Sequence, residues 1–449
     1  MALLVIAAFS LFVFGDVTAK RTPALRSPTL PPHRPAPIPL LSLQDSVNNL
    51  PGFGRPLEKQ YAGLLSIDKK TDTNLFYWLF QNRNETEIAK SPLIIWLQGG
   101  PGASSMYGSL TEKIGPYSVD EDLNLTPNQH AWNQFAHIMF IDFPVGTGFS
   151  YTNSPDRYIR NDTQAANDML EFIGRFRDRH PEFASCPLYI AGESYAGKWV
   201  PAIGARLLEE GINLHGIVLV SPWVHPEAQI PAYTTHADVF GLLTKEQKVH
   251  ADTLMEKCID LFKRGQKLES AKLWDEAAEY IYKCGGGFSP YDVRDTSGTA
   301  DDPGAMDRWL AQSHVRRALN AGNHLWNEDD GVKVFDTLRE DDMVSSLPFL
   351  ELVVQKARVL VVNGKYDWVC NYLGVEDLLD QYLVWDGKYE FLNSRRAWRN
   401  RDTLGGYIRS GGNLTHLVVY DAGHMVPLDQ PEHSFDIMMR FTQSKQLAY

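Results

Sequence analysis

The sequence predicts an α/β protein, in which a mostly parallel central sheet is flanked by helices. Short apolar runs rich in β-branched residues, typical of buried parallel strands, alternate with amphipathic stretches typical of helices. Hydrophobic residues make up 44% of the 449 residues, which is enough to build a large core. Residues 225–350 break the alternation, because they are charged and rich in helix formers, and they predict a helical insertion (cap) on the sheet.

Six apolar runs are expected to be buried strands of this sheet: 93–97, 138–142, 188–191, 217–220, 359–363 and 417–420. A helix is expected between the second and third of these runs. Ala166, Met169, Ile173 and Phe176 recur there at three- and four-residue steps, which is the spacing of one helical face. Pro181 ends this pattern, because proline cannot continue a helix.

The first residues predict entry into the secretory pathway. Residues 3–14 are apolar but too few to span a bilayer, and the small residues that end at Ala19 are typical of a signal-peptidase site. We therefore expect a signal peptide over residues 1–19; a signal anchor is the alternative. Residues 20–44 are rich in proline and predict an extended linker or propeptide, so the catalytic domain is expected over residues 45–449.

Several features of the sequence limit the modifications, partners and cofactors that we expect for this protein. Four Asn-x-Ser/Thr triplets are candidate glycosylation sites on the secretory route: Asn84, Asn124, Asn161 and Asn413. The formal net charge of −12 argues against nucleic acid or an acidic membrane surface as a partner. No later segment has the length of a transmembrane helix, so no membrane anchor is expected. No metal or other cofactor is expected either, and the oligomeric state stays open.

The four cysteines permit at most two disulfides. Cys258 and Cys284 flank one local segment, so they are the expected disulfide pair. Cys186 and Cys370 each lie beside a candidate catalytic element, and we expect both to be free thiols.

A candidate nucleophile, Ser194, lies at a strand-to-helix turn. The segment Gly192-Glu193-Ser194-Tyr195-Ala196-Gly197 follows the apolar run 188–191 and precedes a helical stretch through residue 207. A Gly-x-Ser-x-Gly in this context is a nucleophile elbow, in which the glycines let neighbouring chain pass close to the serine. An ordinary loop is the alternative, but both flanking elements favour the elbow.

A serine hydroxyl needs a base and an acid that orients the base. His424 follows the predicted strand 417–420, and Asp367 follows the predicted strand 359–363. The chain order Ser194, Asp367, His424 is the order found in α/β-hydrolases. These three residues are therefore the predicted catalytic triad.

The negative charge that develops on the attacked carbonyl oxygen requires two N–H donors. Tyr195, the residue after the nucleophile, should supply one of them. The glycine-rich segment after Trp96 should supply the other, and we assign it to Gly100.

Several segments resemble blocks of the serine carboxypeptidase family of α/β-hydrolases, in the order that the family has them: WLQGGPGASS at 96–105, FPVGTGFSY at 143–151, GESYAG at 192–197, 363–371, and GHMVPLDQP at 423–431. The resemblance extends from about Asp45 to the end of the chain. It is closest to the vitellogenic-like carboxypeptidases, whose first block also carries glutamine. An α/β-hydrolase fold is therefore expected.

The resemblance also implies how substrate is chosen. Gln98, Gly99 and Glu193 would bind the free α-carboxylate of a peptide, which requires Glu193 to be a neutral acid because two carboxylates repel. Gln98 replaces the more common asparagine, and Ala103 replaces a cysteine that commonly forms a disulfide. Cys370 would correspond to a thiol near the active site, sensitive to mercurials but not the nucleophile.

We therefore expect a serine carboxypeptidase that releases C-terminal residues from peptides and proteins, best at acidic pH. An acyltransferase on the same scaffold is one alternative, although such enzymes often carry aspartate where this chain has Glu193. A non-catalytic secreted glycoprotein is another, and the intact triad argues against it. The protein is expected to be secreted or to reside in a lysosome-like acidic compartment.

Overall fold

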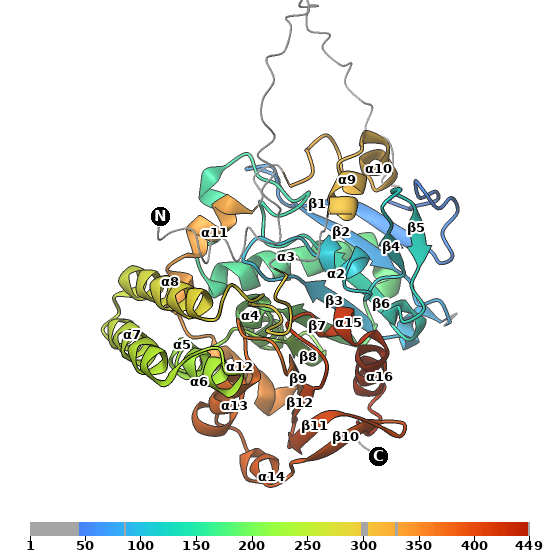
Figure 1. Cartoon of the computed structure of the whole chain (residues 1–449). Helices are drawn as coiled ribbons and strands as arrows, with labels where there is room; N and C mark the ends of the chain where they lie inside the picture. The colour runs from blue at the N-terminus through green and yellow to red at the C-terminus, as the bar shows by residue number, and fades with distance from the viewer. Residues whose placement is uncertain (1–44, 85–86, 298–303, 328–330, 448–449) are drawn as a thin grey trace, which may run out of the picture.

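The computed structural model describes residues 45–84, 87–297, 304–327 and 331–447 (Figure 1). The predicted signal peptide and the proline-rich segment lie outside the described residues. Among the described residues, no helix is both long enough and apolar enough to cross a membrane.

Ten strands form one twisted sheet in the order β1-β2-β6-β3-β7-β8-β9-β12-β11-β10 (Figure 1). The strands are β1 (Gln60–Asp68), β2 (Thr73–Phe80), β3 (Leu93–Leu97), β6 (His137–Ile141), β7 (Leu188–Glu193), β8 (Leu214–Val220), β9 (Arg358–Gly364), β10 (Arg396–Asn400), β11 (Thr403–Gly411) and β12 (Leu414–Val419). The six strands from β6 to β12 pair in parallel, and each contains one of the six predicted runs or most of it. The outer strands pair antiparallel, and β4 (Tyr117–Val119) and β5 (Leu125–Pro127) form a separate small sheet.

Helices cover both faces of the parallel sheet, as expected for strands that are apolar on both sides. Ile95 and Leu219 belong to the core beneath three helices, whereas their neighbours Ile94 and Val218 belong to the core on the opposite face. The first face carries α3 (Asp162–Arg179), α4 (Ala196–Glu209) and α12 (Leu347–Lys356), and the second carries α16 (Pro431–Thr442). Asn161 caps α3 by accepting a hydrogen bond from the N–H of Gln164 at 3.0 Å.

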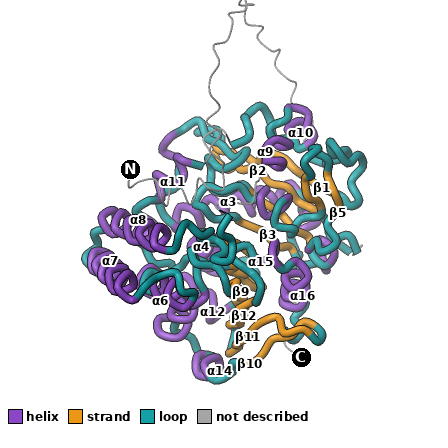
Figure 2. The backbone as a smooth tube through the Cα atoms, viewed as in Figure 1, coloured by secondary structure: helices purple, strands orange, loops and turns teal. Residues whose placement is uncertain are grey.

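Between β8 and β9, the described elements are helical. They are α5 (Pro226–Gln229), α6 (Ala232–Val239), α7 (Lys245–Lys263), α8 (Lys267–Cys284), α9 (Gly304–Leu310), α10 (Ser313–Ala318) and α11 (Val332–Leu338), followed by the 3₁₀ turn η5 (Asp341–Met343) and by α12. The helices α5 to α8 gather on one side of the molecule (Figure 1), with α7 beside α8 (Figure 2). In contrast, α9 packs near β4, where Trp309 stacks on Trp78 of β2. The boundaries of the predicted insertion stay a prediction.

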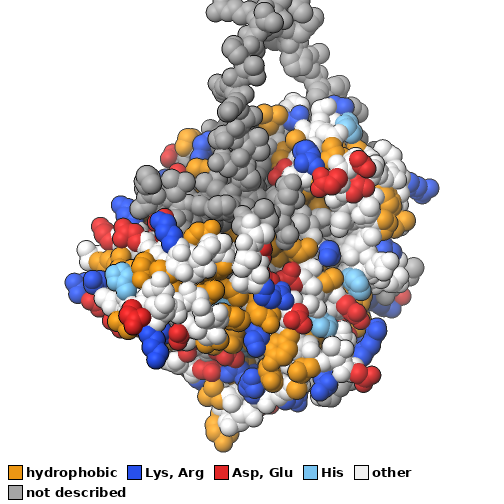
Figure 3. Space-filling model, viewed as in Figure 1, with side chains coloured by type: hydrophobic (Ala, Val, Ile, Leu, Met, Phe, Trp, Pro, Cys, Tyr) orange, Lys and Arg blue, Asp and Glu red, His pale blue; other side chains and the backbone are white. Residues whose placement is uncertain are grey.

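The remaining α-helices are short and lie in the loops around the sheet. They are α2 (Met106–Leu110), α13 (Tyr372–Asp377), α14 (Lys388–Leu392) and α15 (Val426–Asp429). Hydrophobic side chains gather in the middle of the face shown in Figure 3, and charged side chains are more frequent around its rim.

The predicted disulfide between Cys258 and Cys284 is wrong, because both cysteines are free thiols. Cys258 lies on α7 and its sulfur is 3.3 Å from the carbonyl oxygen of Ser270 on α8. Cys284 is at the far end of α8, about 21 Å further along the helix at 1.5 Å per residue. A disulfide requires Cα atoms within about 7 Å. Cys186 and Cys370 are free thiols as predicted.

Candidate active site

Ser194 lies in a strained turn between β7 and α4, as the elbow motif predicts. Its φ angle is +62°, which is unfavourable for a residue with a side chain. The neighbouring loop holds this conformation: the Ser194 N–H donates to the carbonyl of Val220 at 3.0 Å, and its carbonyl accepts from the N–H of Trp223 at 2.9 Å. A Cβ atom on Gly197 would lie only 2.6 Å from Pro222, so the loop can approach only because residue 197 is glycine.

His424 and Asp367 form a buried pair at the carboxyl ends of β12 and β9. The Nδ1 atom of His424 lies 2.8 Å from Asp367 Oδ2, and the two side chains are 3% and 0% exposed. Asp367 Oδ1 accepts from the N–H of Cys370 at 3.0 Å, which fixes the carboxylate plane. The contact at Nδ1 leaves Nε2 of His424 available to accept a proton from a nucleophile.

The end of β8 connects the serine to the histidine. Ser194 bonds to Val220, and the next residue, Ser221, donates its hydroxyl to the carbonyl of His424 at 2.8 Å. Within the described residues, no hydrogen bond joins the Ser194 hydroxyl to His424, and such contacts often tighten only when substrate is bound. Burial raises the pKa of the Cys370 thiol, the charge of Asp367 adds to this rise, and a hydrogen bond with Ser194 opposes it.

The two predicted oxyanion donors lie on adjoining segments. A Cβ atom on Gly99 would lie 2.6 Å from the nitrogen of Tyr195 and 2.7 Å from Cβ of Ser194, so the segment before Gly100 touches the elbow. In the part of the chain that the structure describes, neither the N–H of Gly100 nor that of Tyr195 donates to another group. Two free, adjacent N–H groups are what an oxyanion requires.

The glycine-rich segment is fastened to β6 by two hydroxyl groups. Ser105 donates to the carbonyl of Ile141 at 2.5 Å, and Ser104 donates to the carboxylate of Asp142. Asp142 also accepts from the N–H of Phe149 at 2.9 Å. Burial raises the pKa of Asp142 to about 7, and these donors oppose the rise. The 143–151 segment is thereby joined to the segment that carries Gly100.

Gln98 lies between two buried carboxyl groups, and we call Gln98, Glu112 and Glu193 the carboxyl clamp. The Nε2 atom of Gln98 donates to Glu193 at 2.9 Å and to Glu112 at 2.8 Å, and Trp96 donates to its Oε1 at 2.9 Å. Outside the clamp, the Oε2 atom of each carboxyl group has no hydrogen-bond partner among the described residues, whereas a hydrogen bond between the two carboxyl groups contributes to their pKa shifts. The glutamine therefore reaches Glu193, as the resemblance requires.

Burial raises the pKa values of both carboxyl groups in the clamp. The value for Glu112 rises to about 7, and that for Glu193 rises well above its usual range because the charge of Glu112 adds to the effect of burial. At Glu112, hydrogen bonds with Glu193 and Gln98 and the charge of His424 oppose the rise in pKa. Two such carboxyl groups side by side hold at least one proton at neutral pH.

Three residues of this site were not predicted from the sequence. Glu112 follows α2 and carries no motif of its own, so only the folded chain reveals that it meets Gln98. Trp96 was predicted only as a strand residue, although its indole orients the Gln98 amide. Ser221 lies beyond the predicted run 217–220 and gave no signal.

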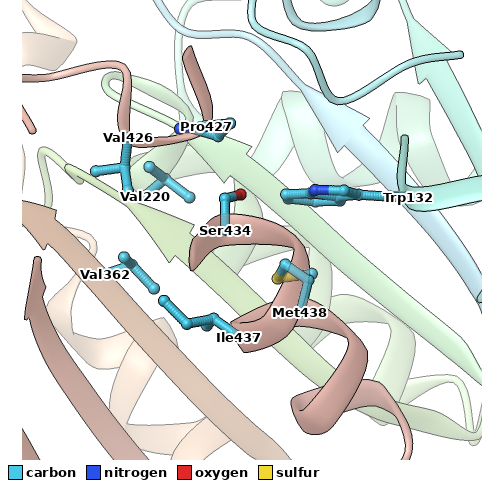
Figure 4. A pocket seen from close by; sticks show the side chains of 8 residues that line it. All are labelled: Trp132, Val220, Val362, Val426, Pro427, Ser434, Ile437 and Met438. Atoms are coloured by element: carbon cyan, nitrogen blue, oxygen red, sulfur yellow. The ribbon is translucent and has the colours of Figure 1, made fainter. Parts of the chain in front are cut away.

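A small cavity lies behind the His424 loop and is too small to be a substrate pocket. Its volume is about 10 Å³. As Figure 4 shows, its lining consists of Trp132, Val220, Val362, Val426, Pro427, Ser434, Ile437 and Met438. Only Ser434 and Trp132 carry polar atoms there, and an ordered water needs two to four polar partners.

The four candidate glycosylation sites are all exposed, which a glycan requires. Asn161 also caps α3, and Asn84 donates its amide to the carbonyl of Gln134 at 2.9 Å. No cluster of three or more metal-ligating side chains occurs among the described residues. Glycosylation itself stays a prediction.

Comparisons with known proteins identify relatives among the serine carboxypeptidases. A family model described as serine carboxypeptidase matches residues 51–444. The venom serine carboxypeptidase of Apis mellifera is 33% identical over 400 residues, which cover 86% of this chain and 84% of that protein. The vitellogenic carboxypeptidase of Aedes aegypti is 31% identical and aligns over 99% of both chains. A crystal structure of a prohormone-processing carboxypeptidase from Saccharomyces cerevisiae, 23% identical, has the same fold with a TM-score of 0.77 over 89% of this chain and 94% of that one.

Proposed function

The chain belongs to the serine carboxypeptidase family and is a serine-type carboxypeptidase, and we propose that it works through Ser194, His424 and Asp367. Ser194 attacks the carbonyl carbon of the last peptide bond while His424 accepts its proton at Nε2. The proton then passes to the departing amino group. Water, activated by the same histidine, releases the acyl group from the serine and restores the enzyme. Asp367 holds the imidazole through its bond to Nδ1.

We further propose that the N–H groups of Gly100 and Tyr195 bind the oxyanion. Three observations support this assignment: both groups are free among the described residues, Gly99 touches the elbow, and Ser194 is held at φ +62°. Removing one such donor from a hydrolase typically costs a factor of about 10²–10³ in kcat.

The observation that carries the preference for chain ends is the carboxyl clamp. A peptide α-carboxylate that replaces the Gln98–Glu193 contact would accept from the Gln98 amide and from the proton of Glu193. Gly99, which touches Ser194, places this site next to the nucleophile. A substrate with an amidated C-terminus has no carboxylate to bind there.

The clamp also predicts the direction of the pH dependence. Binding requires a proton on Glu193, and burial and Glu112 raise the pKa of that group. Peptide hydrolysis should therefore be retained at acidic pH and lost as pH rises through the titration of the Glu112–Glu193 pair. This behaviour suits an acidic compartment of the secretory pathway, or secretion into acidic fluid. The relatives named for venom and vitellogenic proteins agree with the secretory route.

The test is product analysis by mass spectrometry. We expect stepwise loss of C-terminal residues from a peptide with a free C-terminus, and none from the same peptide with a C-terminal amide. Ser194→Ala should lower kcat by a factor of about 10⁴–10⁶ and abolish labelling by an organophosphonate. Internal cleavage, equal hydrolysis of the amide, or turnover by Ser194→Ala would overturn the proposal.

A further inference from the structure

A lysine lies completely buried one turn after the proposed nucleophile. The side chain of Lys198 on α4 is 0% exposed, and its Nζ atom is 3.2 Å from both Asp162 and Asp341. It also donates to the carbonyl of Val344 at 2.7 Å and to the hydroxyl of Ser346 at 3.3 Å. These contacts join the first turn of α4 to the start of α3 and to the segment around η5.

Tyr195 reaches the same place from the residue that carries a proposed oxyanion donor. Its hydroxyl donates to Asp341 Oδ2 at 3.1 Å, the same oxygen that Lys198 contacts. Its ring packs edge-on against Trp199 at 5.2 Å, and the residue is 4% exposed. The side chain is thus fixed at its far end, while its backbone N–H stays free among the described residues.

The segment that carries Asp341 is itself held in place from two sides. The carbonyl of Asp342 accepts from the indole of Trp223 at 3.2 Å, and Trp223 also bonds to the Ser194 carbonyl. The carboxylate of Asp342 pairs with Arg339 at 2.6 Å. Asp341 is therefore a fixed point to which both Tyr195 and Lys198 are attached.

On the basis of the proposed oxyanion hole, we propose that Asp341 and Lys198 are positioning residues that hold the Tyr195 N–H in its catalytic orientation. The peptide plane that carries the Tyr195 N–H is held at one point, where the Ser194 carbonyl accepts from the N–H groups of Gly197 and Trp223, both at 2.9 Å. The hydrogen bond of the Tyr195 hydroxyl adds a second point of attachment, and two points define the orientation of a residue. An oxyanion donor stabilises the transition state only when it points at the developing charge.

This assignment predicts separate effects on kcat and on the ground-state binding of substrate, two properties that a general loss of packing would change together. In the proposed function the substrate carboxylate binds to Gln98 and Glu193 of the clamp and does not use the Tyr195 N–H. Loosening Tyr195 should therefore lower kcat and leave ground-state binding unchanged. A residue that merely stabilises the fold would alter stability, or both kinetic constants, without this separation.

The test uses Tyr195→Phe, which removes only the hydroxyl and keeps the backbone N–H. Tyr189→Phe is the matched control, because the buried Tyr189 hydroxyl also donates to a fixed acceptor, the carbonyl of Thr442 at 3.2 Å, on the far side of the sheet. Active sites are counted with an organophosphonate, so that only folded enzyme is compared. Two ligands are measured: a peptide aldehyde that forms a tetrahedral adduct with serine, and a dipeptide analogue with a reduced scissile bond and a free carboxylate.

We expect Tyr195→Phe to lower kcat and the affinity for the aldehyde by about tenfold each, a fraction of what loss of a whole donor costs. The affinity for the reduced dipeptide should stay within about twofold, and Tyr189→Phe should change neither. Asp341→Ala should act like Tyr195→Phe, whereas Asp341→Asn should restore most of kcat because its amide oxygen still accepts from Tyr195. The double variant Tyr195→Phe, Asp341→Ala should lose no more kcat than Asp341→Ala alone.

The inference is wrong if Tyr195→Phe equals Tyr189→Phe per active site, or if affinity for both ligands falls equally. Should Asp341→Ala not fold, the comparison of the two tyrosine variants decides alone, since each lacks only one hydroxyl. These outcomes differ from a failure of the proposed function. In that case the wild-type enzyme itself would not remove C-terminal residues, or Ser194→Ala would remain active.

Discussion

The carboxyl clamp lies close to Ser194, and so does the cluster that Lys198 forms with Asp162 and Asp341, which we call the Lys198 cluster. The two groups accommodate buried acidic side chains in opposite ways. In the clamp, Glu112 and Glu193 face an uncharged amide, and the charge of one raises the pKa of the other. In the cluster, burial raises the pKa of Asp341 to about 6, but the positive charge of Lys198 opposes that rise. The clamp therefore favours a protonated carboxyl group, whereas the Lys198 cluster favours carboxylates paired with the lysine.

The difference explains why an enzyme proposed to bind an anion carries two acidic side chains at the binding site. A lysine in place of Gln98 would keep its positive charge and hold a carboxylate at acidic and neutral pH alike. A protonated Glu193 holds a carboxylate only while the proton remains. The clamp, in the proposed function, would therefore bind substrate at low pH and repel it at higher pH. The cluster has no such role, because its acids are already paired within the protein, and its charges can act only on the structure around them.

The largest expected effect is the loss of the buried cation. Lys198→Met keeps the volume of the side chain but leaves Asp162 and Asp341 without their positive partner. We expect the free energy of unfolding to fall by about 3–5 kcal/mol, measured by urea denaturation at pH 7. Lys245→Met, at an exposed lysine on α7, is the control and should change it by less than about 0.5 kcal/mol. Equal effects of the two variants would mean that the cluster is not an ion-paired unit.

The next effect concerns the proton of the clamp. Glu193→Gln keeps a neutral hydrogen-bond donor that cannot ionise. Above the titration of the pair, kcat/KM of the wild-type enzyme for a blocked dipeptide should fall up to about tenfold per pH unit, whereas that of the variant should fall much less. An ester substrate without a free carboxylate should show little difference between the two enzymes. A variant whose peptide and ester profiles both shift alike would contradict the role of Glu193 in binding carboxylate.

The sequence predicts the centre of the molecule better than its edges, and the reason is physical. Strands such as β7 and β9 are buried on both faces, so their apolar runs identify them. The edge strand β10 is mostly polar and forms because β11 offers it hydrogen bonds, which no local pattern encodes. The antiparallel strand β2 was not predicted although it is buried along its whole length, because β1 and β2 do not alternate with helices as the strands of the parallel sheet do.

The residues of the site also divide into those that a local sequence pattern predicts and those that it does not. Ser194 and its neighbours form local motifs, because an elbow is built from adjacent residues. The Asp367–His424 pair was predicted from strand ends and is present at 2.8 Å. Contacts made at a distance in the chain, such as Gln98 with Glu112, depend on how α2 folds back and have no local signal. The disulfide prediction failed because closeness in sequence was taken for closeness in space, although a helix separates its residues steadily along its axis.

The smallest expected effect is on the free energy of unfolding, and it tests whether the buried carboxyl groups of the clamp lower that free energy. The pKa of Glu112 in the folded protein is about 7, above its ordinary value of 4.5. A group whose pKa is raised on folding stabilises the protein fully below its unfolded pKa, and that contribution is lost as pH rises through the folded pKa. The wild-type free energy of unfolding should therefore fall between pH 5 and pH 8.

Glu112→Gln removes this titration, so its unfolding free energy should fall less over the same range, by on the order of 2 kcal/mol. Glu121→Gln, at a glutamate that is 82% exposed, should keep the wild-type slope. The measurement is urea denaturation of the three proteins at several pH values. If Glu112→Gln keeps the wild-type slope as well, Glu112 is ionised throughout, and the clamp would resemble the Lys198 cluster after all. A smaller slope would mean that the site gives up stability at neutral pH in order to keep a proton for its substrate.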